Sequence, residues 1–146
     1  MPLEGEAHKA HVDVIDHTAD IGLQIRASSA GQAFSAVALG MFDIMVDRQA
    51  IRATERRTLR VGAENWEDLL LQWLQELLCM YELDRLVPAS CSIREIGSNA
   101  LLADLDGEEL DLSRHATGPQ IKAVTYHQLR AEETADGFAI RVIFDI

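Results

Sequence analysis

The sequence predicts an α+β fold, a two-layer sandwich in which two amphipathic helices pack on one face of a mostly antiparallel β-sheet. Two long segments carry apolar residues at helical spacing, and the other segments alternate apolar and polar residues as strands do. The predicted order is β-β-α-β-α-β-β-β-β, which differs from the regular alternation of strand and helix in a doubly wound sheet. We expect a single domain over residues 11–146, after a flexible N-terminus over residues 1–10.

The first two predicted strands lie before the first helix. Their apolar residues occupy every second position: Val12 and Val14 in one, and Ile21, Leu23 and Ile25 in the other. Between them the sequence reads Asp16-His17-Thr18-Ala19-Asp20, which places two acids and an imidazole close together. This polar interruption is consistent with a turn and also with a binding site.

The first helix is predicted from Ser29 to Val46. Ser29 is a suitable N-cap, and Gln32, three residues later, completes a capping box. One apolar stripe follows at positions i, i+3, i+4 and i+7: Ala30, Ala33, Phe34, Val37, Ala38, Met41, Phe42 and Met45.

The second helix is predicted after a strand over residues 52–61. Asn65 is a good N-cap, and Asp68 in the first turn is favourably placed against the helix dipole. The apolar stripe again has helical spacing: Trp66, Leu69, Leu70, Trp73, Leu74, Leu77, Leu78 and Tyr81. Both tryptophans fall on this stripe, so we expect them in the hydrophobic core rather than stacked on a ligand.

Strands are predicted after the second helix over residues 87–96, 100–105, 121–131 and 138–146. The last of these remains apolar up to its end, which reads VIFDI. Chain ends fray unless they are tied down, so an end this hydrophobic is predicted inside the sheet. This placement would fix the Asp145 side chain and the α-carboxylate of Ile146 at one half-buried point.

Two such anions need a counter-charge in surroundings of low dielectric constant. A lysine or arginine could supply it, and so could a hard metal ion with oxygen ligands. Lys122, in the otherwise apolar segment QIKAVTYH, is the candidate within the chain. The residues alone favour a purely structural ion pair between Lys122 and Asp145 over a functional site, because such pairs are common outside active sites.

Composition and motifs narrow the classes of function. A net charge of −11 repels phosphate backbones, so strong direct binding of nucleic acid is not expected. No apolar run approaches the roughly 20 residues that cross a bilayer, and the N-terminus lacks the apolar core of a secretory signal, so we expect a cytoplasmic protein without a membrane partner. Cys79 and Cys91 form no Cys-x-x-Cys pair and are expected to be buried, reduced thiols. The glycine-rich nucleotide motifs, the nucleophile elbow and zinc-type spacings are absent from the sequence.

Four stretches of the sequence resemble the archease family. They are DHTADIGLQIRASSAGQAFSAVALGMFDIMVD near the start, LLLQWLQELLCMYE in the second helix, GPQIKAVTYHQL, and the terminal VIFDI. The resemblance spans nearly the whole chain, in order and at the expected spacing. It implies a small cytosolic protein that assists the RtcB-type RNA ligase.

That ligase joins RNA ends that carry a 2′,3′-cyclic phosphate or a 3′-phosphate to a 5′-hydroxyl, using GTP and a divalent metal. It must first attach GMP to its own histidine, and members of the family promote this guanylylation. The resemblance therefore implies an activator in tRNA splicing and RNA repair, and not an enzyme.

The resemblance also implies a metal site. Asp20, Asp145 and Ile146 match the family's ligands, the last through its backbone or terminal carboxylate, and Lys122 matches its functionally important lysine. The implied metal is calcium, although magnesium or manganese would also suit such oxygen ligands. Asp16 is expected to form the turn or support it by hydrogen bonding, and His17 to orient Asp20 or simply pack.

His115 and His127 are expected to be ordinary residues without a role in the site. Two other functions remain open. A metal-dependent phosphoesterase would use the same carboxylates around a bound water, although no histidine or lysine is clearly placed as its general base. A chaperone-like binding module would instead bind other RNA-processing proteins.

Overall fold

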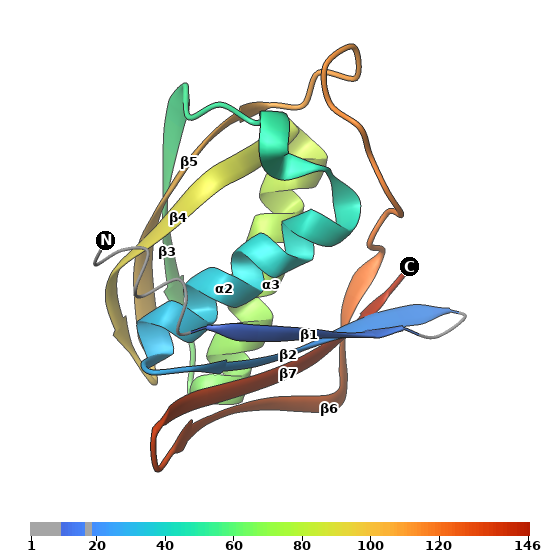
Figure 1. Ribbon diagram of the computed structural model, residues 1–146. Coiled ribbons are helices and arrows are strands. Elements are labelled where there is room, and N and C mark those ends of the chain that lie inside the picture. Colours follow the sequence, from blue (N-terminus) through green and yellow to red (C-terminus); the bar gives the residue numbers. More distant parts are fainter. Residues whose placement is uncertain (1–9, 17–18) are drawn as a thin grey trace.

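The computed structural model describes residues 10–16 and 19–146, so residues 1–9 of the predicted flexible N-terminus lie outside it. Its elements, in chain order, are β1 (His11–Asp16), β2 (Asp20–Ala27), α2 (Ala30–Met45), the 3₁₀ helix η1 (Arg48–Ala50), β3 (Glu55–Gly62), α3 (Trp66–Asp84), β4 (Leu86–Gly97), β5 (Ala100–Glu109), β6 (Ala123–Thr134) and β7 (Gly137–Asp145). The described strands form two antiparallel sheets, with both helices in the angle between them (Figure 1).

The strands divide into a four-stranded sheet of order β1-β2-β7-β6 and a three-stranded sheet of order β3-β5-β4. The predicted α+β class, with two helices on antiparallel strands, is confirmed, but the expectation of a single sheet is wrong. Residues 110–122, between β5 and β6, carry the chain from the smaller sheet to the larger one (Figure 1). Alternation along a strand indicates which face is buried and not which strand lies beside it, so the sequence does not reveal this division.

Both helices begin at their predicted caps. The Gln32 backbone N–H donates to Ser29 Oγ at 3.2 Å, and the Asp68 backbone N–H donates to Asn65 Oδ1 at 2.8 Å. α3 ends at Asp84, and the next residue, Arg85, caps it with a left-handed backbone with φ of 56° and an N–H that donates to the Tyr81 carbonyl at 2.9 Å.

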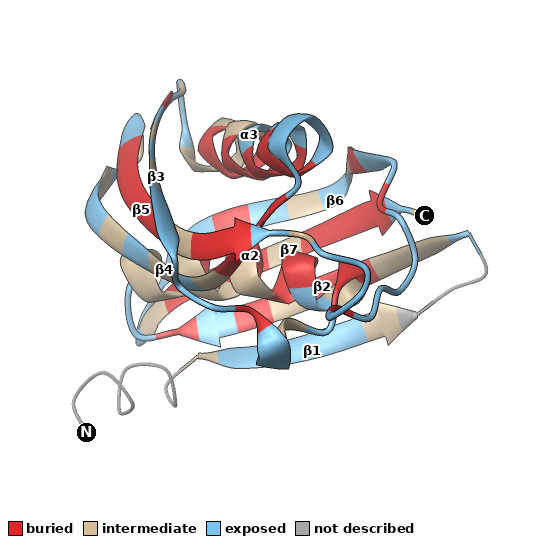
Figure 2. Ribbon diagram, turned by 90° about the horizontal axis from the view of Figure 1, so that it is seen from above, coloured by how far each residue is buried: buried red, intermediate tan, exposed pale blue. Residues whose placement is uncertain are grey.

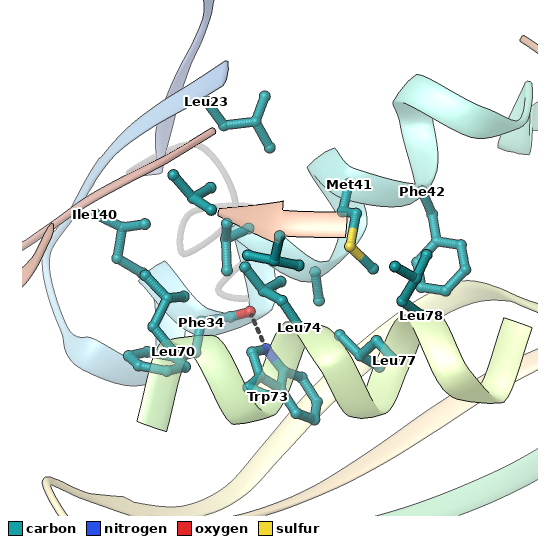
Figure 3. Close-up of a cluster of buried hydrophobic side chains, with 14 of the residues drawn as sticks. Leu23, Phe34, Met41, Phe42, Leu70, Trp73, Leu74, Leu77, Leu78 and Ile140 are labelled. Atoms are coloured by element: carbon teal, nitrogen blue, oxygen red, sulfur yellow. Dashed lines mark hydrogen bonds between the residues drawn. The ribbon is translucent and has the colours of Figure 1, made fainter. Parts of the chain in front are cut away.

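The core lies between the helices and the sheets. α2 contacts β2, β4 and β7, and α3 contacts β3 and β6, so each helix touches both sheets. Trp73 of α3 is fully buried, and its Nε1–H donates to the Phe34 carbonyl of α2 at 3.0 Å (Figure 3). Trp66 is half-buried and meets the ring of Phe138 edge-on, with the ring centroids 4.8 Å apart. Both tryptophans therefore belong to the core, as predicted.

β7 lies inside its sheet, between β2 and β6, which confirms the prediction from its apolar sequence. Its helix-facing side chains are all buried: Phe138, Ile140, Val142 and Phe144. Figure 2 shows β7 as a mostly buried strand beneath the helices. The last strand is thus a central part of the fold.

The cysteines do not match the expectation that both are buried. Cys79 is exposed on the polar side of α3, outside the apolar stripe, and Cys91 is half-buried on β4. Burial raises the pKa of the Cys91 thiol to about 12, so this thiol stays protonated at neutral pH.

In the described part of the chain, neither α2 nor α3 is long and apolar enough to cross a membrane.

Candidate functional site

Asp20 and Asp145 are brought together by the pairing of β2 with β7. Asp20 begins β2, Asp145 ends β7, and the antiparallel register places the two residues directly opposite each other. Directly opposed residues point to the same face of a sheet, with Cβ atoms about 4.5–5.5 Å apart. Leu23 and Val142, three positions along the same two strands, are buried on the helix side, so the alternation places both carboxylates on the opposite face.

Backbone hydrogen bonds fix the chain at this point. The Ile146 N–H donates to the Ala19 carbonyl at 3.3 Å, and the Lys122 N–H donates to the Asp145 carbonyl at 2.7 Å. The strand end is therefore bonded on both sides. These bonds hold the backbone oxygens of Ile146 at the same end of the sheet as Asp20.

One carboxylate oxygen of Asp20 has no partner. Its Oδ1 is buried, and no described donor forms a hydrogen bond with it. A buried acceptor without a hydrogen bond costs about 1–3 kcal/mol. A cation would satisfy this oxygen and would also balance the neighbouring charge of Asp145. The unpartnered oxygen beside a second carboxylate fits a hard cation with oxygen ligands, such as calcium.

The described side chains do not complete such a site by themselves. In residues 10–16 and 19–146, no three Asp, Glu, His or Cys side chains are arranged so that they could hold a metal ion. Asp20 and Asp145 would supply two ligands, and the others would be the backbone oxygens of Ile146, water or groups of a partner. A set of oxygen donors suits calcium, magnesium or manganese better than it suits zinc.

Lys122 lies beside the two acids, immediately before β6. The neighbouring Ile121 is fully buried, whereas the side chain of Lys122 is exposed to solvent. It forms no ion pair with a described carboxylate, so the structural ion pair with Asp145 that the residues alone favoured is wrong. Its ammonium group is available to a ligand or partner that approaches this end of the sheet.

The structure tests the other two predicted residues only in part. Asp16 ends β1, and its backbone pairs with Ile21, next to Asp20, so the strand break lies where the sequence predicts it. The side chain of Asp16 and the whole of His17 lie outside the described residues. Their supporting roles therefore remain predictions.

His115 is buried, although the sequence indicates no role for it. The Asp111 N–H donates to His115 Nδ1 at 2.9 Å, which leaves the ring proton on Nε2, 3.2 Å from a carboxylate oxygen of Glu108. Glu108 also accepts from the Arg52 N–H at 2.7 Å and from the Arg114 guanidinium. These donors, the Arg52 N–H first among them, hold the pKa of Glu108 below its ordinary value.

This cluster fixes the start of the segment 110–122, which ends at Lys122. Four of its members lie within residues 108–115 and the fifth, the Arg52 N–H, comes from a distant loop, so the sequence shows a short run of charged residues and not their contacts. His127, in contrast, is exposed, and its backbone N–H donates to Thr125 Oγ1 at 3.3 Å.

A hollow of about 560 Å³ lies elsewhere, between the C-terminal end of α2 and residues 116–118. Neither Asp20 nor Asp145 lines it. Its arginine, Arg48, already bonds Asp43 and the carbonyls of Pro88 and Ala89. Because the Arg48 guanidinium is already bonded within the protein, this hollow is a weaker candidate for the functional site than the paired carboxylates.

Comparison with known proteins identifies a matching family. Residues 13–146 match the sequence model described as the Archease protein family. Protein archease of Thermococcus gammatolerans is 41% identical over 125 residues, which cover 84% of this chain and 88% of the relative. Protein archease of Methanosarcina barkeri is 35% identical over 138 residues, which cover 92% of this chain and 94% of the relative.

Solved structures share the fold. The solution structure of protein 1598 from Methanobacterium thermoautotrophicum superposes with a TM-score of 0.79 at 27% identity, and covers 92% of this chain and 98% of its own. The crystal structure of an archease from Thermotoga maritima, described as a possible chaperone, superposes with a TM-score of 0.62 at 23% identity, and covers 90% of this chain and 94% of its own.

Proposed function

Because this chain belongs to the archease family, we propose that it is a cytoplasmic activator of a GTP-dependent RNA ligase of the RtcB type. It would promote attachment of GMP to the ligase histidine, so that the ligase turns over repeatedly in tRNA splicing and RNA repair. In this proposal the chain catalyses no reaction of its own. One structural observation supports the proposal most: the unpartnered Oδ1 of Asp20 lies on the residue paired with Asp145.

The proposed metal ligands are Asp20, Asp145 and the backbone oxygens of Ile146. Calcium, or magnesium or manganese, would supply a positive charge to which phosphate oxygens bind. Asp20 and Asp145 would hold that charge on the sheet face away from the helices, where a partner can reach it. The exposed ammonium of Lys122 would add a second positive charge beside it, and Asp16 and His17 would support the strand break.

The test is guanylylation of the cognate ligase by GTP, with and without this protein. We expect the wild-type chain to raise the yield of guanylylated ligase, and we expect Asp20→Ala and Asp145→Ala to lose most of this stimulation. Glu76→Ala is the matched control, because it removes an exposed carboxylate from α3, far along the chain from the site. Circular dichroism would show that all three variants are folded.

Stimulation by both aspartate variants at the wild-type level would overturn the metal-site mechanism. Failure of the wild-type chain to stimulate its ligase would overturn the proposed function itself. Hydrolysis of a phosphoester by the isolated protein, lost in the same variants, would favour the phosphoesterase instead.

A chaperone-like role is the second candidate, because the similar Thermotoga maritima structure is described as a possible chaperone. This role predicts slower aggregation of a heated RNA-processing protein in the presence of this chain. It further predicts that the effect does not depend on Asp20 or on added metal, which separates it from the ligase proposal.

A further inference from the structure

The strand β6 is interrupted next to the candidate site. Its residues Ala123–Thr125 pair with β7, and pairing resumes at Arg130, which lies opposite Arg141. Four residues of β6, 126–129, therefore face the single residue Val142 of β7. Figure 1 shows β6 turning between its orange beginning, beside the C-terminus, and its darker remainder.

This bulge exposes a side chain that the strand pattern would bury. Val124 faces the core and Thr125 the opposite face, so regular pairing would place Tyr126 opposite Val142, on the helix side. Tyr126 is instead 75% exposed. Bulges are known to redirect side chains beside functional sites.

The bulge is an ordered structure held by its own contacts. Gln128 has a left-handed backbone with φ of 55°, a conformation that non-glycine residues adopt at some cost. The Arg141 guanidinium donates to Gln128 Oε1 through Nε at 3.0 Å and through a terminal nitrogen at 2.6 Å. The His127 N–H donates to Thr125 Oγ1 at 3.3 Å. Tyr126 is thus presented on a fixed support rather than on a loose loop.

The position of Tyr126 relative to the acids gives the bulge its significance. Ala123 pairs with Asp145, and Tyr126 follows three residues later, about 10 Å along the strand at about 3.3 Å per residue. The exposed Tyr126 therefore follows the exposed Lys122 by four residues, on the stretch of β6 that begins opposite Asp145. Tyrosine is enriched among the few residues that contribute most binding energy at protein interfaces.

We propose that Tyr126 is the anchor by which this protein docks onto its protein partner, with the Asp20–Asp145 face turned toward that partner. The recognised surface is an apolar pocket for the phenol ring with a basic rim that complements the acids and the net charge of −11. This inference rests on the proposed function, in which the partner is the RNA ligase. A nucleic-acid partner is disfavoured by the same net charge.

The test is the affinity of the full chain for its cognate ligase, measured by biolayer interferometry without nucleotide. We expect Tyr126→Ala to weaken binding by about 30-fold, as hot-spot residues do. Tyr126→Phe keeps the ring, and we expect it to stay within about fivefold of the wild type. Leu112→Ala is the control, because Leu112 is 74% exposed on the segment between β5 and β6; it should bind as the wild type does.

Thermal unfolding and calorimetric titration with calcium chloride should give the same values for Tyr126→Ala and the wild type, since the ring lies outside the core and the metal ligands. Equal affinity of Tyr126→Ala and the wild type for the ligase would overturn this inference and leave the proposed function intact. A wild-type chain that does not bind the ligase would overturn both. Unchanged ligase affinity with a higher KM for RNA or GTP would assign Tyr126 to the substrate instead.

Discussion

Asp145 of β7 lies directly opposite Ala123 of β6 on one side and Asp20 of β2 on the other. The three side chains therefore form a row across neighbouring strands on the face away from the helices. The row consists of the two carboxylates of Asp20 and Asp145, followed by the methyl group of Ala123. Ala123, at the third position of the row, is exposed to solvent. This arrangement leads to specific expectations for metal binding.

Calcium should stabilise the wild-type chain against unfolding, because it binds the folded carboxylates and not the unfolded chain. At a calcium concentration of about 100 times Kd the gain in free energy of unfolding is about 2.7 kcal/mol. Asp20→Ala should lose most of this gain, and Glu76→Ala should keep it. Differential scanning calorimetry in calcium and in EDTA measures the effect; equal calcium responses of the wild type and Asp20→Ala would contradict it.

Ala123→Asp should raise calcium affinity, since it extends the row to three carboxylates. In EDTA the same variant should be less stable than the wild type, because a third negative charge lies opposite Asp145. Ala100→Asp adds the same charge at an exposed position of β5 and should show neither effect. Isothermal titration with calcium, paired with urea unfolding in EDTA, distinguishes these outcomes.

Extension of the chain beyond Ile146 should weaken metal binding if a terminal carboxylate oxygen is a ligand. The added peptide bond removes the charge and keeps only one carbonyl oxygen. The same tag placed at the N-terminus should have no effect on affinity. Equal calcium affinities for the two tagged proteins would limit the ligands to side chains and the carbonyl.

Ionised Glu108 should stabilise the folded protein at neutral pH, and this stabilisation should disappear on acidification. Its pKa in the folded protein lies below the ordinary value of 4.5, chiefly because it accepts the Arg52 N–H. A lowered pKa stabilises the fold fully above about pH 4.5, and this contribution is lost as the pH falls through the folded-state pKa. Glu108→Gln should therefore show a flatter pH dependence of urea unfolding below pH 4.5 than Glu109→Gln, which alters an exposed neighbour.

Local patterns predicted the elements of this fold well. The caps Ser29 and Asn65 and the two apolar stripes placed both helices, because these signals lie within one or two turns of the chain. The division of the strands into two sheets depends on pairings between distant segments, which alternation does not encode. The apolar end of the chain predicted a central last strand and did not identify β2 as its neighbour.

The candidate site was predictable to a similar degree. The residues alone single out Asp145 at the apolar chain end and Asp20 in the polar interruption, and the family resemblance groups them as ligands; the register gives a physical reason for their proximity. The apolar segment around Lys122 favours an ion pair with Asp145, whereas the family resemblance is equally compatible with an exposed lysine, and the structure shows Lys122 exposed. Tyr126 was missed because a bulge leaves no trace in a run of strand-forming residues.

The pairing of β2 with β7 also predicts the order of events during folding. The first helix, the second sheet and the second helix all lie between these strands in the chain, so their pairing closes a very long loop. Closing long loops is slow relative to forming helices and hairpins. During refolding, calcium affinity should therefore emerge in the slowest phase, after helical circular dichroism has recovered, and a calcium-binding signal would mark the molecules in which the whole chain has folded.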